Sequence, residues 1–215
     1  MPGHEASIEL ASDSAEAKVH HMGLTRVTFV GAGGAAAAAA GSDEWQIDRV
    51  VAVRGESLPP ARVLERVESS DNDTPPPAGG VWSLRGVRSN DRYVERGEKD
   101  RLAAIQPGLG RADSRVAALV PIRKSEAWWN LAQDERRALF ETTSRHIAIG
   151  LQYLPAIARR LYHCRDVGGE PFDFLTWFEF AARDSAAFDE LLGRLRATEE
   201  WRYVEREVEV RVRRP

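Results

Sequence analysis

Three side chains with different acid–base chemistry lie close together in the C-terminal half of the sequence. Within Glu141–Phe180, His146 carries an imidazole, Arg159 a guanidinium and Glu179 a carboxylate. A neutral imidazole can ligate a metal through one ring nitrogen when a hydrogen bond holds the other. A guanidinium stays protonated at physiological pH and can therefore bind a small anion. This segment is the first candidate for a functional site.

His146 falls on the apolar face of a predicted helix, where a histidine is more often a core residue than a metal ligand. Glu179 shares one face of a predicted strand with Leu175 and Trp177. A carboxylate among such side chains must be paired, or it becomes protonated. A hydrogen bond from His146 would pair it and make the imidazole a stronger donor. The alternative is a salt bridge from Glu179 to an arginine at a sheet edge.

The surroundings of the candidate site include an amide and two large aromatic side chains. Gln106 follows a predicted helix over 92–105 and would fix the guanidinium of Arg159 through its amide oxygen. Trp128 and Trp129 precede the next predicted helix. Flat aromatic side chains suit the wall of a macrocycle pocket, although they also pack well in an ordinary core.

Two other ligand chemistries fit the sequence less well. A zinc site built from His146, His163 and Glu179 would need three ligands at one point, but the histidines lie on different predicted elements without metal-type spacing. His163 is therefore expected to be structural. Gly31–Ala36 matches a dinucleotide-binding loop only loosely, because any helix after it is short and Glu56 is poorly placed for a ribose contact.

The composition is that of an ordinary globular chain. Its 215 residues suffice for one large or two small domains, and the net charge of −3 indicates no basic surface for nucleic acid. The single cysteine, Cys164, rules out an internal disulfide. No apolar run is long enough to span a bilayer. Because Met1–Lys18 is acidic where a signal peptide would be basic, we expect a cytoplasmic rather than a periplasmic protein.

The elements that would position the candidate residues become regular after residue 110. Period-2 alternation predicts strands, and apolar residues at three- and four-residue spacing predict helices. The strands cover 116–122, 158–166, 172–180 and 203–212, and the helices cover 134–151 and 185–196. This β-α-β-β-α-β order is that of the ferredoxin-like unit.

These elements divide the chain into three parts. Residues 1–24 are predicted to be a mobile leader, because they include few large apolar side chains. Residues 25–110 look like a shortened ferredoxin-like half, and residues 111–215 form the half with the candidate site. The predicted fold class is α+β: two such units would join their sheets in an α+β barrel that encloses a ligand between sheet and helix.

The C-terminal half resembles the chlorite dismutase family, most closely its short, dimeric branch. The resemblance rests on the Lys-Ser-Glu-Ala-Trp-Trp sequence from Lys124, on His146, and on three longer segments: Tyr153–Asp166, Phe172–Glu179 and Leu195–Trp201. It extends from about Trp82 to the C-terminus and, more faintly, back to Thr25. It implies a ferredoxin-like repeat in a dimeric α+β barrel, with haem b in the C-terminal half.

The resemblance also implies an activity and roles for individual residues. The protein would be a chlorite O2-lyase, converting chlorite to chloride and dioxygen. His146 would be the proximal iron ligand, Glu179 its hydrogen-bond partner and Trp177 the tryptophan on that side of the haem. Arg159 would be the distal arginine that retains the hypochlorite intermediate, and Gln106 would contact it.

Three further residues, Tyr93, Lys124 and Trp128, match positions near the haem propionates. Trp129 is expected to contact the cofactor as a flat aromatic side chain in the pocket wall. The resemblance thus predicts haem b and the chlorite anion as ligands and a homodimer as the assembly, with no nucleic-acid or membrane partner. The alternatives are a haem-binding peroxidase, carrier or sensor of the same superfamily, and a ferredoxin-like oligomer without a cofactor.

Overall fold

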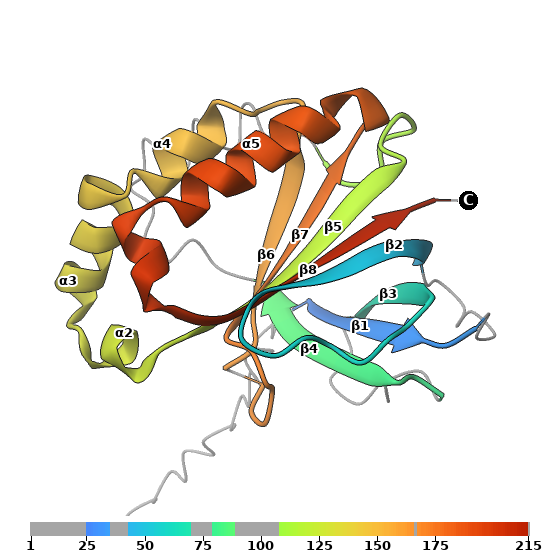
Figure 1. Cartoon of the computed structure of the whole chain (residues 1–215), viewed down its shortest axis with the longest axis horizontal. Helices are drawn as coiled ribbons and strands as arrows, with labels where there is room; N and C mark the ends of the chain where they lie inside the picture. The colour runs from blue at the N-terminus through green and yellow to red at the C-terminus, as the bar shows by residue number, and fades with distance from the viewer. Residues whose placement is uncertain (1–24, 35–42, 70–78, 89–107, 166, 215) are drawn as a thin grey trace, which may run out of the picture.

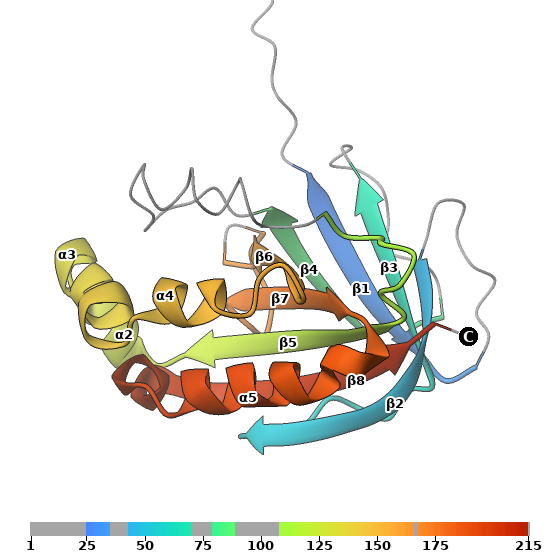
Figure 2. The same cartoon turned by 90° about the horizontal axis from the view of Figure 1, so that it is seen from above.

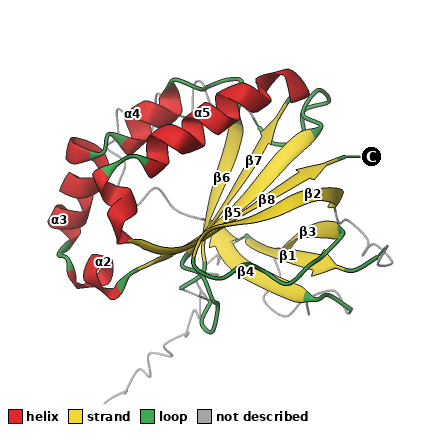
Figure 3. Ribbon diagram, in the orientation of Figure 1, coloured by secondary structure: helices red, strands yellow, loops and turns green. Residues whose placement is uncertain are grey.

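The fold is a closed antiparallel β-barrel with helices packed against part of its outer surface (Figure 1; Figure 3). This computed structural model describes residues 25–34, 43–69, 79–88, 108–165 and 167–214. No helix within these ranges is long and apolar enough to cross a membrane. The predicted leader over 1–24 lies outside the described residues.

Eight strands follow one another around the barrel in the order β1-β3-β2-β8-β5-β7-β6-β4. Every neighbouring pair is antiparallel. The strands are β1 (Arg26–Ala32), β2 (Asp43–Arg54), β3 (Val63–Ser69), β4 (Trp82–Arg88), β5 (Val116–Lys124), β6 (Ala158–His163), β7 (Phe174–Phe180) and β8 (Val204–Arg213).

The described helices all belong to the C-terminal half of the chain. They are α2 (Glu126–Asn130), α3 (Gln133–Arg137), the π-helix η1 (Ala138–Thr143), α4 (His146–Leu151), the short 3-10 helix η2 (Ala182–Asp184), α5 (Ser185–Arg196) and the 3-10 helix η3 (Glu199–Tyr203). Figure 2 shows α4 and α5 lying along the outer face of the sheet formed by β5 to β8. One face of this part of the sheet therefore looks into the barrel and the other toward helices.

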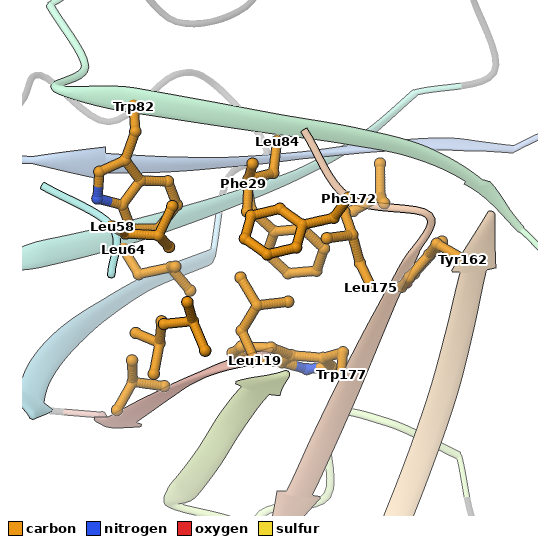
Figure 4. Packing of buried hydrophobic residues seen from close by; sticks show 14 of the residues in the cluster. Phe29, Leu58, Leu64, Trp82, Leu84, Leu119, Tyr162, Phe172, Leu175 and Trp177 are labelled. Carbon is orange, nitrogen blue, oxygen red and sulfur yellow. The ribbon is translucent and has the colours of Figure 1, made fainter. Parts of the chain in front are cut away.

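Strand side chains alternate between these two environments. On β7, Leu175 and Trp177 belong to the apolar cluster inside the barrel, which Figure 4 shows from close by. Phe178 and Phe180 point the other way and pack against Phe188 of α5, with ring centroids 5.0 and 4.6 Å from it. Each strand in this half therefore supplies one set of side chains to the barrel core and another to the space beneath the helices.

Strand β8 shows how charged residues are accommodated beneath α5. Its valines at 208, 210 and 212 fill the barrel, whereas Glu207 and Glu209 lie on the helix side. Both carboxylates are buried and accept hydrogen bonds from Arg196 of α5 at 2.7 Å. Pairing removes most of the cost of burying them, so the alternating charges of this strand anchor a helix.

The predicted fold class, an α+β ferredoxin-like repeat in a dimeric α+β barrel, is wrong. The structure is a single closed barrel of eight antiparallel strands, in which the described helices lie along one part only. Two strand pairs close the ring: β2 pairs with β8 over a long stretch, and β4 pairs with β6 over a short one. The order of elements along the chain is a local property and does not specify these pairs, which leave the sheet without a free edge.

The predicted continuous helix over 134–151 is also wrong. The structure divides it into α3, η1 and α4. Ser144 donates its backbone N–H to Leu139, five residues back, and Arg145 then adopts a left-handed conformation with φ 52°. The three-to-four spacing of apolar residues persists through this segment, so the sequence pattern gave no sign of the break.

Gly31 belongs to a strand rather than to the nucleotide-binding loop considered from the sequence. It lies in β1, and a Cβ added to it would come within 2.0 Å of the indole ring of Trp82. The indole is nearly buried, and its Nε1 donates to the backbone oxygen of Pro59 at 3.1 Å. Close packing of this ring explains why the strand contains a glycine at position 31.

We expect Gly31→Ala to destabilise the protein by about 1–3 kcal/mol, because the indole must move and strain its hydrogen bond. Gly33→Ala is the matched control: nothing lies within 4 Å of its added Cβ, so the change should stay within about 0.5 kcal/mol. Urea unfolding followed by circular dichroism measures both. An equal loss of the free energy of unfolding in both variants would contradict the packing argument. A cost for Gly31→Ala that is as large in a Trp82→Leu background as in the unaltered protein would also contradict it.

Candidate active site on the helix-covered face

The imidazole of His146 is held by a buried carboxylate from a distant part of the chain. His146 is the first residue of α4, and its Nδ1 lies 2.8 Å from Oε2 of Glu200 in η3. The other oxygen, Oε1, accepts a hydrogen bond from Nζ of Lys124 at 2.7 Å. The carboxylate therefore bridges an imidazole and an ammonium group. With Nδ1 engaged, Nε2 is the ring nitrogen left for a ligand.

This carboxylate is an anion despite its burial. The side chains of Lys124 and Glu200 are only 3% and 5% exposed. Burial by itself raises the pKa of Glu200, but the charges and hydrogen bonds of His146 and Lys124 outweigh it and lower the pKa to about 2. Burial lowers the pKa of Lys124, and the attraction of Glu200 offsets part of that effect. The imidazole thus faces an acceptor that is charged at neutral pH.

Neighbouring groups hold this network in place. Nζ of Lys124 lies 4.5 Å from the ring centre of Trp128 and 5.4 Å from that of Trp201. The backbone N–H of Glu200 donates to Oγ of Ser144 at 2.9 Å. Lys124 and Trp128, which were predicted to lie near the propionates of a cofactor, are both buried in the network that anchors the histidine.

The predicted hydrogen bond between His146 and Glu179 is wrong. Glu179 points to the barrel side of β7, where it accepts hydrogen bonds from Nε1 of Trp177 at 2.8 Å and from the backbone N–H of Gly110. Helix α4 lies on the opposite side of the sheet. Alternation correctly grouped Glu179 with Trp177, but alternation does not reveal which of the two faces the helices cover.

The predicted place of Trp177 beside the histidine is wrong for the same reason. Its ring is fully buried inside the barrel, with centroids 5.5 Å from Phe29 and 5.4 Å from Trp45. The tryptophan near the imidazole is Trp201, whose ring centroid lies 6.3 Å from that of His146 at an interplanar angle of 21°.

Arg159 lies on the helix-covered face. It pairs with Phe178, whose side chain packs against α5, and directly opposite residues on neighbouring strands point to the same side. A Cβ added to Gly150 of α4 would lie 3.3 Å from Nη1 of Arg159. Gly150 follows His146 by about one helical turn. The short helix α4 therefore carries the imidazole and also, at Gly150, leaves room for the guanidinium of Arg159.

An apolar side chain lies uncovered on this face. Leu161, two residues after Arg159, is 39% exposed. The register places it opposite Thr176, which in turn lies opposite Val120, a residue packed under α5. Leu161 therefore faces the helix side and would provide apolar contact to a ligand held there.

Unpaired donors and positive charge gather around Trp129. Its ring stacks on Phe174 with centroids 5.9 Å apart, and guanidinium groups lie 4.0 Å (Arg165) and 5.6 Å (Arg136) from its centre. Among the described residues, none accepts a hydrogen bond from its buried Nε1. A buried donor without an acceptor, next to two cations, fits a ligand that brings a carboxylate.

The remaining predictions for the site have different outcomes. Gln106 and Tyr93 lie outside the described residues. His163 packs edge-on against a phenylalanine of β7, with ring centroids 5.1 Å apart. In the described part of the chain, no group of three or more His, Cys, Asp or Glu side chains could hold a metal ion. The zinc alternative required His146, His163 and Glu179 at one point, whereas Glu179 lies on the barrel side of the sheet and His163 on the opposite face.

Glu200 was not predicted from the sequence. It follows another glutamate in a short 3-10 helix, where no periodicity separates a buried side chain from an exposed one. The available signal was Lys124, at the end of a strongly apolar strand. A lysine that is buried needs a carboxylate partner, and an acidic residue far along the chain had to supply it.

The fold and the site together define a class of protein. It is a closed antiparallel barrel with helices against one part of its sheet, and one histidine at the start of a helix has a ring nitrogen anchored on a buried carboxylate. A family model described as "Chlorite dismutase" matches residues 80–214, which is more than half of the chain. The chain belongs to the chlorite dismutase family.

Individual relatives agree with this assignment. The dimeric chlorite dismutase of Nitrobacter winogradskyi is 53% identical with a TM-score of 0.75, covering 87% of this chain and 99% of its own. The chlorite dismutase of Ideonella dechloratans is 32% identical over 126 residues, which make up 56% of this chain but only 41% of that relative. A chlorite dismutase from Candidatus Nitrospira defluvii in complex with imidazole is 18% identical, covers 88% of this chain and 91% of its own, and has a TM-score of 0.59. This last likeness shows the fold alone.

The depressed pKa of Glu200 predicts how stability depends on pH. A carboxyl group with a lower pKa in the folded state stabilises the fold above its ordinary pKa of 4.5, and this contribution is lost as pH falls toward about 2. Glu200→Gln should therefore cost about 3–5 kcal/mol at neutral pH by leaving Lys124 without a counter-charge, and should flatten the acid decline. Guanidinium unfolding at a series of pH values measures both effects.

The neighbouring Glu199 provides the control for this prediction. Its side chain is 39% exposed and pairs with Arg202 on the surface, so Glu199→Gln should change stability by less than about 1 kcal/mol. Adding Lys124→Met to Glu200→Gln should restore much of the loss, because no unpaired charge then remains buried. A similar acid decline for Glu200→Gln and the unaltered protein would contradict the assignment.

Proposed function

We propose that this chain binds haem b and converts chlorite to chloride and dioxygen. The observation that carries the proposal is the arrangement around α4, where His146 is anchored on Glu200 and Arg159 approaches Gly150 one turn further on. Membership of the family and the 53% identity with the N. winogradskyi enzyme support it. The reaction keeps every atom of the substrate and needs no added oxidant or reductant.

The residues present fit a haem. A single imidazole with its Nδ1 held by a hydrogen bond would be suited to ligate haem iron through Nε2. Leu161 offers apolar contact to the ring, and Nε1 of Trp129 together with the guanidinium of Arg165 offers donors for a propionate. Lys124 is buried against Glu200, so we assign it the role of keeping that carboxylate charged rather than of touching the haem.

The chain's own residues then bind, orient and retain the reactants. A haem held here would supply redox chemistry at its iron. Arg159 would attract the chlorite anion and retain the oxychlorine anion in the site by charge and hydrogen bonds. Glu200 fixes the imidazole of His146 through Nδ1. Gly150 leaves the space that the guanidinium needs, since even a methyl group there would lie 3.3 Å from Nη1.

We also propose that the chain works as a homodimer. The N. winogradskyi relative is dimeric, and this chain covers 99% of it. Closed two-fold dimers are the commonest soluble assemblies. The other function that fits the same site is haem binding without chlorite turnover, as in a peroxidase, a carrier or a sensor; haem uptake with no oxygen release from chlorite would favour it.

His146→Ala should lose haem, because the iron then has no axial nitrogen from the chain. We expect no stable Soret band after haem addition, and partial recovery when free imidazole is supplied. Glu200→Gln should weaken haem binding by a smaller factor of about 10–100. His163→Gln is the control and should keep the unaltered Soret spectrum. Full haem occupancy in His146→Ala would rule out its role as the ligand.

Arg159→Gln should still bind haem but turn over chlorite poorly. Loss of a charged hydrogen-bond donor to the anion is expected to lower kcat/KM about ten- to hundredfold, measured as oxygen release with a Clark electrode. The enzyme should also inactivate sooner, because escaping hypochlorite attacks haem and aromatic side chains. Arg160→Gln is the matched control, since Arg160 bonds Glu68 and points to the barrel side. Equal oxygen yield per haem in both variants would remove Arg159 from the mechanism.

A further inference from the structure

The backbone immediately before His146 is irregular in two ways. The π-helix η1 replaces the usual four-residue hydrogen bonding, with Ser144 N–H donated to Leu139 O at 3.0 Å. Arg145 then adopts φ 52° and ψ 38°, the left-handed conformation that side chains other than glycine rarely take. Such conformations persist only where the surrounding structure enforces them, and they gather at functional sites.

This irregular backbone creates one contact that a regular helix would forbid. In a continuous α-helix, residues 140 and 146 would be separated by about 9 Å along the axis and about 120° around it. In the structure, the ring centroids of Phe140 and His146 are 4.4 Å apart and their planes differ by 22°. The π-helix η1 and the left-handed conformation of Arg145 together bring the ring of Phe140 onto the imidazole.

A side chain of η1 also secures the start of α4. The carboxylate of Glu141, one residue after Phe140, accepts a hydrogen bond from the backbone N–H of Ile147 at 3.0 Å. The ring of Trp201 lies nearly parallel to the imidazole at 6.3 Å. Glu200 fixes one atom of the ring, whereas a stacked phenyl group restrains the plane of the ring. A hydrogen bond to Nδ1 tolerates some tilt of the imidazole plane, and the stack with Phe140 narrows that range.

We propose that Phe140 is a positioning residue. The π-helix η1 holds its ring against the imidazole of His146, so that the imidazole presents Nε2 to its ligand in one fixed plane. The orientation toward a haem rests on the function proposed above, but the stack itself does not. A planar ligand takes one defined rotation relative to the imidazole plane only if rotation about the histidine side-chain bonds is restrained. Among the described contacts of His146, the 4.4 Å stack with Phe140 is the closest ring contact.

The test compares Phe140→Leu, which removes the ring but keeps an apolar side chain, with Phe140→Tyr, which keeps the ring. In the haem-loaded protein, Phe140→Leu should broaden or shift the iron–histidine stretching band in resonance Raman spectra and speed haem transfer to apomyoglobin about two- to tenfold. Phe140→Tyr should leave the band and the transfer rate as they are in the unaltered protein. An unchanged band and transfer rate in Phe140→Leu would overturn the proposal, as would the same change in both variants.

A measurement on the haem-free protein separates this proposal from the proposed function. The carbon-bound ring protons of His146 should be shifted upfield in the NMR spectrum by the phenyl ring, and the shift should vanish in Phe140→Leu and remain in Phe140→Tyr. Absence of the shift from the unaltered protein would overturn the stack. A protein that shows the shift but takes up no haem would overturn the proposed function while supporting the restraint on the imidazole.

Discussion

The buried contact of Glu200 with His146 and Lys124 is the constraint on which the rest of the site depends. A carboxylate enclosed by protein needs partners for its charge, and here one comes from the end of β5 and the other from the start of α4. The contact therefore ties together a strand, a helix and the 3-10 turn before β8. Removing water from this set of groups makes each interaction stronger and makes an unpaired member costly.

The second constraint is the two-sidedness of the sheet formed by β5 to β8. Its inner face fills the barrel with large apolar side chains, and its outer face carries Arg159 and Leu161 toward the helices. A ligand on the outer face is thereby separated from the barrel core by one layer of backbone. The core can be packed for stability alone, while the outer face keeps polar, exposed and irregular features.

The sequence indicated some of this arrangement and not the rest. His146 and Arg159 were identified from residue chemistry and from a resemblance in a long C-terminal block, and the structure places them around one short helix. Glu179 was chosen in place of Glu200 because a strand pattern says which residues share a face but not which face meets the helices. The closed barrel was missed because pairing of β2 with β8 joins residues about 160 positions apart. The break before His146 was missed because its apolar spacing is that of a regular helix.

Strand β6 has a consequence for how the protein can change during evolution. Arg159 faces the helices and Arg160, its neighbour, faces the barrel, where it bonds Glu68. Because the side-chain period is two, inserting or deleting one residue in this strand would exchange the two arginines and turn Leu161 inward in place of Tyr162. Lineages that descend from this chain can therefore vary in loop length far more readily than in the length of this strand. The place of Arg159 within this strand becomes a property that selection on the site would hold fixed.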